Sequence, residues 1–301
     1  MDLTERQNVR DAKTLLNILK PKNSSPPPFK GIPYDEMILE HLKSTPNITS
    51  TPDPNLLILC GPPGCGKSTI KNNLLREISI QTYINIDPDE IRTVLMSQGV
   101  TFPDDKTMAG ITNNFNKRIS DFSLESNYNI VFDTTGQNLI AMYDLLKQSR
   151  QKGYQIYFVV IWASLETCKR RVKMRNEKLL AEGSGRIQLD LGVVEQIYSG
   201  FVKPKGGIAS NYLITYPITA NQILLYNNDN DNQDPQLLYK KVGNHVQNPV
   251  IPKPGFYDMN IVSQPPYIVK IGSGGKRRKT KRNTRTKRTK RRTIRKKYIR
   301  K

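Results

Sequence analysis

The chain has 301 residues and a formal net charge of +21, from 47 Lys and Arg residues against 26 Asp and Glu. Seventeen of the basic residues lie in Lys276–Lys301, which has no acid, so the first 275 residues carry only +4 (21 less 17). No run of 18 apolar residues exists, and the N-terminus lacks the apolar segment of a secretory signal. We therefore expect a cytoplasmic or nuclear protein that is neither secreted nor inserted in a membrane, with one sizeable core and a separate basic tail.

The first 50 residues carry no recognisable chemistry. Residues 1–20 and 34–44 have the apolar spacing of short helices, and a Pro-rich linker without a helical option separates them at 21–33. A second loop rich in Pro, Ser and Thr follows at 45–55. We expect this part to be N-terminal helices and a disordered linker placed before the main domain.

From residue 56 to residue 226 the pattern alternates between strands and helices. Short apolar runs predict strands at 56–60, 82–86, 129–132, 154–162 and 221–226. Amphipathic segments predict helices at 68–78, 90–97, 106–125, 138–152, 164–180 and 190–202. This order predicts an α/β fold with a doubly wound, mostly parallel sheet of the P-loop kinase type over 51–226. A C-terminal extension of the core is expected over 227–271, with edge strands at 237–242 and 267–271, before a disordered tail at 272–301.

A complete phosphate-binding motif, G-x-x-x-x-G-K-S, lies between the first predicted strand and the next helix. It consists of Gly61, Pro62, Pro63, Gly64, Cys65, Gly66, Lys67 and Ser68, and we add Thr69 to the predicted nucleotide-binding residues. Glycines let backbone N–H groups turn inward onto phosphate oxygens, and the helix that follows adds its positive end. Lys67 is expected to reach the β- and γ-phosphates and Ser68 a Mg²⁺ ion. The expected cofactors are therefore ATP or GTP and Mg²⁺.

Acidic residues follow the second and third predicted strands, where ligands of open α/β sheets bind. We favour Asp89 as the base that takes the acceptor's proton, and Asp87 as a metal or substrate contact. The alternative is that both carboxylates only cap a helix with Pro88 at its first position. Arg92, Asp133 and Thr134 are predicted to contact substrate. Because Asp133 is followed by two threonines rather than a glutamate, and no guanine-reading N-K-x-D motif exists, the pattern does not indicate a site that polarises water.

The helix predicted at 164–180 is strongly basic and opens a candidate lid over about 164–190. Phosphoryl-transfer enzymes stabilise spreading charge with arginines from such lids, and a Gly-rich hinge suits the motion. We assign catalytic roles to Arg175 and Arg186, and interpret most of the other cations as solvated surface. The roles of Lys169, Arg170 and Arg171 stay open.

The motifs together resemble the zeta-toxin family of P-loop kinases. The matching pieces are the phosphate loop, I-D-P-D-E-I-R ending at Arg92, V-F-D-T-T-G around Asp133, and the lid arginines, and they span about residues 56–226. The resemblance implies ATP or GTP as donor, Asp89 as base, and phosphate grip by Lys67, Arg175 and Arg186. Family toxins phosphorylate UDP-N-acetylglucosamine. Asp133-Thr-Thr-Gly stands where bacterial members often carry Glu-Gly-Thr, so the resemblance does not identify the acceptor.

Three functions are therefore compared: a kinase for a small acceptor such as a nucleotide sugar, a polynucleotide 5′-hydroxyl kinase or repair factor, and an ATP-binding switch that associates with nucleic acid. Lys276–Lys301 suits phosphate-backbone binding or nuclear import, and the alternative is a solubilising tail. In its basic tail and its frequent use of Asn, Ile and Lys, the chain resembles proteins of large DNA viruses. The Asp-rich run 229–234 lacks the Gly and Glu of a calcium loop and predicts a turn. His41 and His245 are interpreted as structural or exposed.

Overall fold

The computed structural model describes residues 34–43, 45, 48–97, 99–101, 104–183, 188–202, 220–243 and 245–249. The chain divides into two compact units, 1–266 and 267–301, and every described residue belongs to the first. The helix expected at 1–20, the Pro-rich linker, the strand expected at 267–271 and the basic tail lie outside the described residues.

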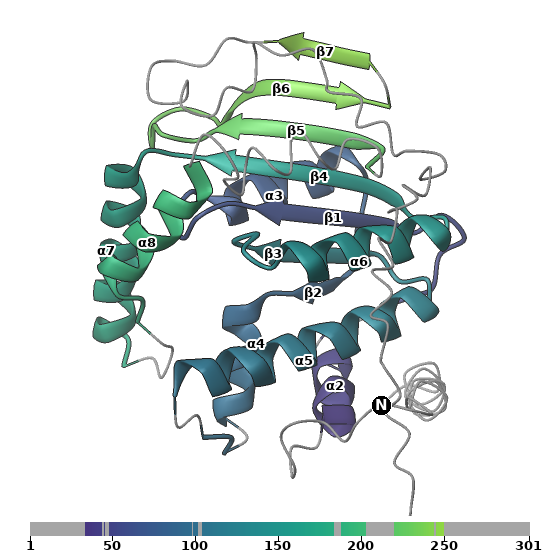
Figure 1. Ribbon diagram of the computed structural model, residues 1–301, viewed down its shortest axis with the longest axis horizontal. Helices are drawn as coiled ribbons and strands as arrows, with labels where there is room; N and C mark the ends of the chain where they lie inside the picture. Colours follow the sequence, from purple (N-terminus) through teal and green to yellow (C-terminus); the bar gives the residue numbers. More distant parts are fainter. Residues whose placement is uncertain are drawn as a thin grey trace, which may run out of the picture. The chain divides into compact units, whose positions relative to one another are not determined.

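Among the described residues, one or two helices separate the successive strands of the first five, and the last three strands follow one another without a helix between them (Figure 1). The helices are α2 Tyr34–Lys43, α3 Lys67–Glu77, α4 Pro88–Ser97, α5 Asp105–Glu125, α6 Leu139–Gln151, α7 Leu165–Ala181 and α8 Leu191–Val202. The strands are β1 Asn55–Cys60, β2 Ile84–Ile86, β3 Ile130–Thr134, β4 Gln155–Trp162, β5 Gln222–Asn227, β6 Gln236–Val242 and β7 His245–Pro249. Every helix and strand predicted within the described residues is present, with bounds that differ by one or two residues. Strand β7 was not predicted, and it is β7 rather than β6 that forms the edge of the sheet.

The strands form one sheet in the order β2-β3-β1-β4-β5-β6-β7. Pairing is parallel from β2 to β5 and antiparallel at β6 and β7, which confirms the mostly parallel α/β fold. Because β1 to β5 run in the same direction, the segments that follow them meet at one edge of the sheet, the carboxyl edge. That edge gathers the phosphate loop, the turn into α4, the end of β3, the start of α7 and the loop after β5.

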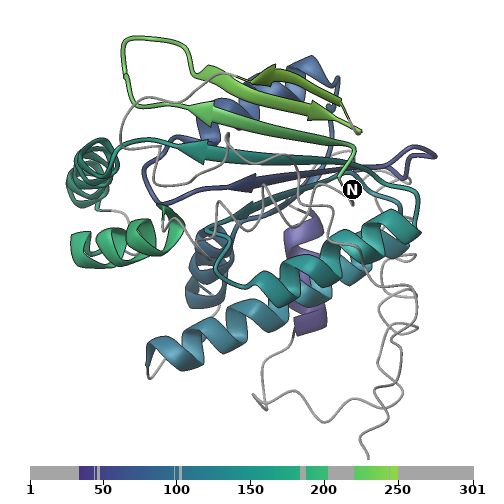
Figure 2. The same cartoon turned by 45° about the horizontal axis from the view of Figure 1, so that its top comes forward.

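Apolar packing covers both faces of the sheet, and successive residues of β1 alternate between them. Leu56, Ile58 and Cys60 belong to the larger core cluster, whereas Leu57 and Leu59 belong to the smaller one. The larger cluster packs against α2, α4, α5 and α6, and the smaller against α3 and α7 (Figures 1 and 2). Strands buried on both faces explain why the sequence shows continuous apolar runs rather than alternation.

Helix α2 is fastened to α5 by more than apolar contact. Tyr34, Met37 and Ile38 are fully or almost fully buried in the larger core cluster. Arg118 of α5 pairs with Asp35 at 2.6 Å and also lies over the Tyr34 ring, 5.2 Å from its centroid. The helix therefore belongs to the core of the described unit. No helix within the described ranges combines the length and apolarity that crossing a bilayer requires.

Candidate active site

The phosphate loop follows β1 and turns directly into α3. Gly64 and Gly66 have φ of +81° and +91°, a conformation that side chains with a Cβ rarely adopt. A Cβ on Gly64 would lie 2.4 Å from the backbone oxygen of Cys168, and a Cβ on Gly66 would lie 1.9 Å from Nδ2 of Asn228. Both glycines are therefore required by the turn and by the chain packed against it. The strand-loop-helix context expected for the motif is present.

Lys67 is the first residue of α3 and its side chain is only 14 % exposed. Its ammonium donates to the backbone oxygens of Gly61 at 3.0 Å and Pro62 at 3.3 Å, and lies 3.6 Å from the carboxylate of Asp133. Burial alone would lower the pKa of this ammonium, but the Asp133 carboxylate and other nearby anionic groups raise it above its ordinary value. Lys67 is therefore a permanent cation at the mouth of the loop.

Asp133 is the penultimate residue of β3, beside the phosphate loop. Burial, with a smaller contribution from the charges of Asp87 and Asp89, raises its pKa to about 6 against the lowering effect of Lys67. Burial likewise raises the pKa of Asp87, which also feels the charge of Lys67. These carboxylates are therefore within electrostatic reach of one another at the carboxyl edge, as the strand order β2-β3-β1 requires.

Asp87 and Asp89 play different local roles. One Asp87 carboxylate oxygen accepts from the backbone N–H of Asp89 at 2.9 Å, so Asp87 caps α4 with Pro88 at the first helical position. The Asp89 side chain is 65 % exposed and pairs with Arg92 at 3.1 Å. Asp87 therefore caps α4 with one carboxylate oxygen, while Asp89 leaves most of its carboxylate open to solvent and to a ligand.

Ser68 and Thr69 are exposed at the start of α3, beside Lys67. Thr134 instead supports the turn after β3: its hydroxyl accepts from the Gly136 N–H at 2.9 Å, and its backbone oxygen accepts from Gly61 at 3.1 Å. Among the described residues no group of three or more His, Cys, Asp or Glu forms a metal cage. A cation at this site would therefore depend on the Ser68 hydroxyl, single carboxylates and phosphate oxygens.

The basic residues of α7 separate into paired and unpaired groups. Lys169 pairs with Glu195 of α8 at 2.7 Å, and both Arg170 and Arg171 pair with Asp231. The role of Arg171 was left open by the sequence, and in the structure its side chain is 19 % exposed and lies against the phosphate loop. Arg175 is exposed one turn further along, and Arg186 lies outside the described residues.

The segment after β5, residues 228–235, packs against the phosphate loop. The buried Asn228 side chain donates from Nδ2 to the Cys65 carbonyl at 2.9 Å. This segment, Gly66, Thr69 and Arg171 together line a cavity of about 530 Å³. Sequence reasoning predicted only a turn at 229–234, since no motif marks Asn228 or Asp231. The one available signal was their position directly after a parallel strand.

The remaining polar candidates are structural. The ring Nε2 of His41 is 2.9 Å from the backbone oxygen of Asn85, in a largely buried position, as expected for a structural histidine. The side chain of His245 lies outside the described set. Cys60, Cys65 and Cys168 are free and buried, and burial raises the pKa of all three thiols. These thiols are therefore packing groups and not nucleophiles.

Part of the chain is similar to known proteins. Residues 56–204 match the family model described as "AAA domain". Among solved structures, a chain of the PezAT chromosomal toxin–antitoxin system of Streptococcus pneumoniae aligns with a TM-score of 0.51 and 17 % identity, over 69 % of this chain and 79 % of that one. A crystal structure of AvrRxo1-ORF1:-ORF2 with ATP aligns with a TM-score of 0.49 and 12 % identity, over 82 % and 70 %. No curated protein matches the sequence significantly. None of these findings bears on the resemblance to viral proteins.

Proposed function

We propose, from the premise that residues 56–204 form a P-loop domain of the AAA-domain family, that this protein is a zeta-toxin-like kinase. It would move the γ-phosphate of ATP to a hydroxyl of a small acceptor such as a nucleotide sugar. The observation that carries the proposal is the meeting of Lys67, Asp133 and the Asp87–Asp89 turn at one edge of the sheet. A phosphate-binding cation thus lies beside carboxylates that suit proton transfer.

The nucleotide would bind across the phosphate loop. Gly64 and Gly66 carry no side chain where the loop turns, and α3 adds its positive end and the Lys67 ammonium. The cavity beside Gly66 and Thr69 has room for a nucleoside, and its walls carry amide side chains that both donate and accept hydrogen bonds. These features fit a nucleoside triphosphate without choosing between ATP and GTP. Gly61, Pro62, Pro63 and Cys65 complete the loop around the phosphates.

Mg²⁺ would be held by the Ser68 hydroxyl and, directly or through water, by Asp87. The exposed position of Ser68 beside the buried Lys67 fits this assignment. When bound, the ion would neutralise charge on the phosphates.

Acceptor chemistry would fall to the turn after β2. The Asp89 carboxylate is the better base because it is exposed, whereas one oxygen of Asp87 is occupied by the α4 cap. Arg92 pairs with Asp89 and would contact the acceptor, together with Asp133 and Thr134 of β3. Arg175 and Arg186 of the lid would stabilise charge on the transferring group.

Transfer of label from γ-³²P-ATP tests the proposal directly. The purified full chain is incubated with Mg²⁺ and separate acceptor panels: nucleotide sugars, nucleosides, 5′-hydroxyl oligonucleotides and a small-molecule cell extract. A labelled small molecule that depends on Lys67 supports the proposal, with Lys67→Met as the matched inactive chain. Label on oligonucleotide ends alone would favour the polynucleotide kinase instead. Phosphate release with no labelled acceptor in any panel would contradict a kinase.

A further inference from the structure

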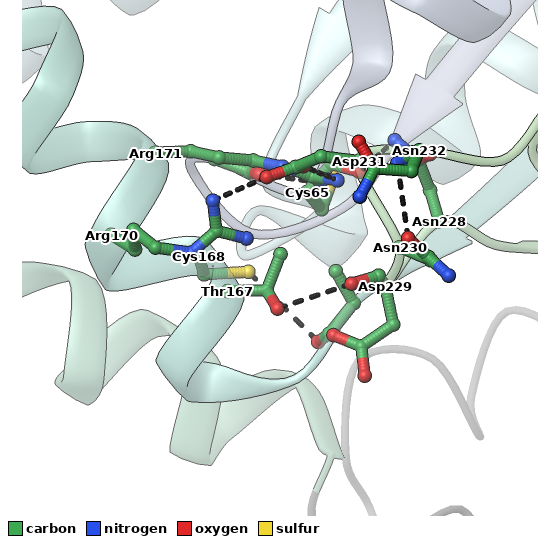
Figure 3. A network of polar contacts seen from close by, with 12 residues as sticks. Cys65, Thr167, Cys168, Arg170, Arg171, Asn228, Asp229, Asn230, Asp231 and Asn232 are labelled. Atoms are coloured by element: carbon green, nitrogen blue, oxygen red, sulfur yellow. Dashed lines mark hydrogen bonds and ion pairs between the residues drawn. The ribbon is translucent and has the colours of Figure 1, made fainter.

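The segment 228–235 is fastened to the rest of the site by three side chains (Figure 3). Asn228 binds the Cys65 carbonyl, as described above. Asp229 accepts from the backbone N–H of Ser164 at 2.8 Å, at the first turn of α7. Asp231 accepts from two arginines of α7. The phosphate loop, α7 and this segment are therefore one connected polar unit.

Asp231 is shared between two guanidinium groups, one on each carboxylate oxygen. Arg170 binds Oδ2 through Nη1, and Arg171 binds Oδ1 through Nε at 2.7 Å and Nη2 at 2.5 Å. These hydrogen bonds hold the pKa of Asp231 below its usual range. A single exposed ion pair contributes little to stability. A carboxylate that binds two nitrogens along one edge of a guanidinium, however, fixes the plane of the guanidinium.

Arg171 has a further bond that completes the geometry. Its Nη1 donates to the backbone oxygen of Gly64, inside the phosphate loop, at 3.2 Å. All three nitrogens of Arg171 are thus engaged in the plane of the guanidinium, by Asp231 on one side and Gly64 on the other. The group has few free N–H donors left to grip a phosphate, but its flat faces are not used by these bonds.

Arg171 also lines the cavity beside Gly66 and Thr69. A guanidinium whose edges are occupied offers its face, and the ligand chemistry that a face suits is a flat aromatic ring. We propose that Asp231 is a positioning residue that turns the face of Arg171 toward the base of the bound nucleotide. This role rests on the proposed nucleotide binding of the same site, and assigns Arg171 to the base while Lys67 serves the phosphates.

Arg175, the lid arginine with a proposed catalytic role, lies on the same helix as Arg171. Arg171 and Arg175 are four residues apart on α7, so they lie on one face of the helix, one turn from each other. The buried residues of α7, Thr167, Cys168 and Val172, set the rotation of the helix about its own axis. Arg170 is 50 % exposed and makes no bond to the phosphate loop. It binds the other carboxylate oxygen of Asp231.

Binding of two ligands to the full chain separates the base from the phosphates. ATP has both parts, and inorganic tripolyphosphate has only the phosphates. Asp231→Asn is expected to weaken ATP binding about tenfold, the scale of a lost cation–π contact or charged hydrogen bond, and to change tripolyphosphate binding by less than about threefold. Arg171→Lys keeps the charge but loses the planar group, and should give the same selective loss. Asp231→Glu should restore most of the ATP affinity.

Lys178→Gln, at an exposed position of α7, is the matched control and should bind both ligands as the parent chain does. Calorimetry or displacement of a fluorescent ATP analogue measures all the affinities. Unchanged ATP binding by Asp231→Asn would overturn the inference. Equal losses for the two ligands would also overturn it, since Asp231 would then only support the phosphate loop. A parent chain that binds tripolyphosphate and not ATP would contradict the proposed function itself.

Discussion

Replacing Gly66 by alanine tests how the phosphate loop is held by the end of β5. The new Cβ would lie 1.9 Å from Nδ2 of Asn228, in a residue with φ of +91°. Asn228 has to move, so its hydrogen bond to the buried Cys65 carbonyl is lost. The left-handed backbone costs roughly 1–2 kcal/mol and the unsatisfied carbonyl roughly 1–3 kcal/mol. We expect Gly66→Ala to lower the free energy of unfolding by about 2–5 kcal/mol.

The double variant separates the two contributions. Asn228→Ala removes the amide that would clash with the new Cβ, and with it the hydrogen bond to Cys65. By itself this variant should cost about 1–3 kcal/mol of stability. In that background Gly66→Ala should add only its backbone term, so the double variant is about as stable as Gly66→Ala alone. Gly64→Ala is the control, because its Cβ would meet the Cys168 backbone oxygen at 2.4 Å, and removing Asn228 gives no relief there.

Urea unfolding of the parent chain, the single variants and the double variants measures these costs, provided the slope m stays constant. A coupling of about 1–3 kcal/mol between positions 66 and 228, with strict additivity between 64 and 228, is the expected outcome. Additive costs at 66 and 228 would show that Asn228 does not hold the loop, and would refute the reasoning.

Three further predictions address charge. Because burial raises the pKa of Asp133 to about 6, kcat/KM should increase as the pH rises through about 6. The pH–rate profile of Asp133→Asn should lack this increase. Lys67→Met should weaken ATP binding about ten- to a hundredfold by calorimetry. It also leaves Asp133 buried without its cation, which raises the pKa of that carboxyl further. The native state then holds a proton that the unfolded state has lost, so urea unfolding should show stability falling as pH rises from about 4 through the folded pKa, more than in the parent chain. Arg118→Ala breaks the pair with Asp35 and should lower the free energy of unfolding by about 1–2 kcal/mol; an unchanged midpoint would mean that α2 is held by its apolar face alone.

Local patterns were sufficient to predict every element of the described unit except β7. Apolar runs predicted β1 and β4, and amphipathic spacing predicted α6, in which Leu145, Leu146 and Ser149 are buried. The cap residue Asn138 accepts from the Ala141 N–H at 3.1 Å, as a helix start requires. Strand β7, with the sequence H-V-Q-N-P, has one apolar residue and no alternation, so it could only be found through its pairing with β6.

Residues of the candidate site could be predicted only where they belong to a contiguous sequence motif or directly follow a predicted strand. The phosphate loop is such a motif, and the residues after β2 and β3 follow from strand order. The bond from Asn228 to Cys65 joins residues 163 positions apart, and Arg170 is 61 positions from Asp231. Such contacts depend on where β5 lies in the sheet, which no local pattern records. Arg171 was therefore left open beside Arg170, although only Arg171 contacts the phosphate loop.

The central claim is that the Asp89 carboxylate takes the acceptor's proton at a nucleotide held by the phosphate loop. Single-turnover transfer from γ-³²P-ATP to the labelled acceptor, measured for Asp89→Asn together with the ATP dissociation constant, tests it most directly. Glu90→Gln is the matched control, because Glu90 is the next acid on α4 and accepts only from Asn85 among the described residues. The account predicts a rate lower by about 10²- to 10⁴-fold for Asp89→Asn, with ATP affinity unchanged. A variant that transfers phosphate at the parent rate would contradict it.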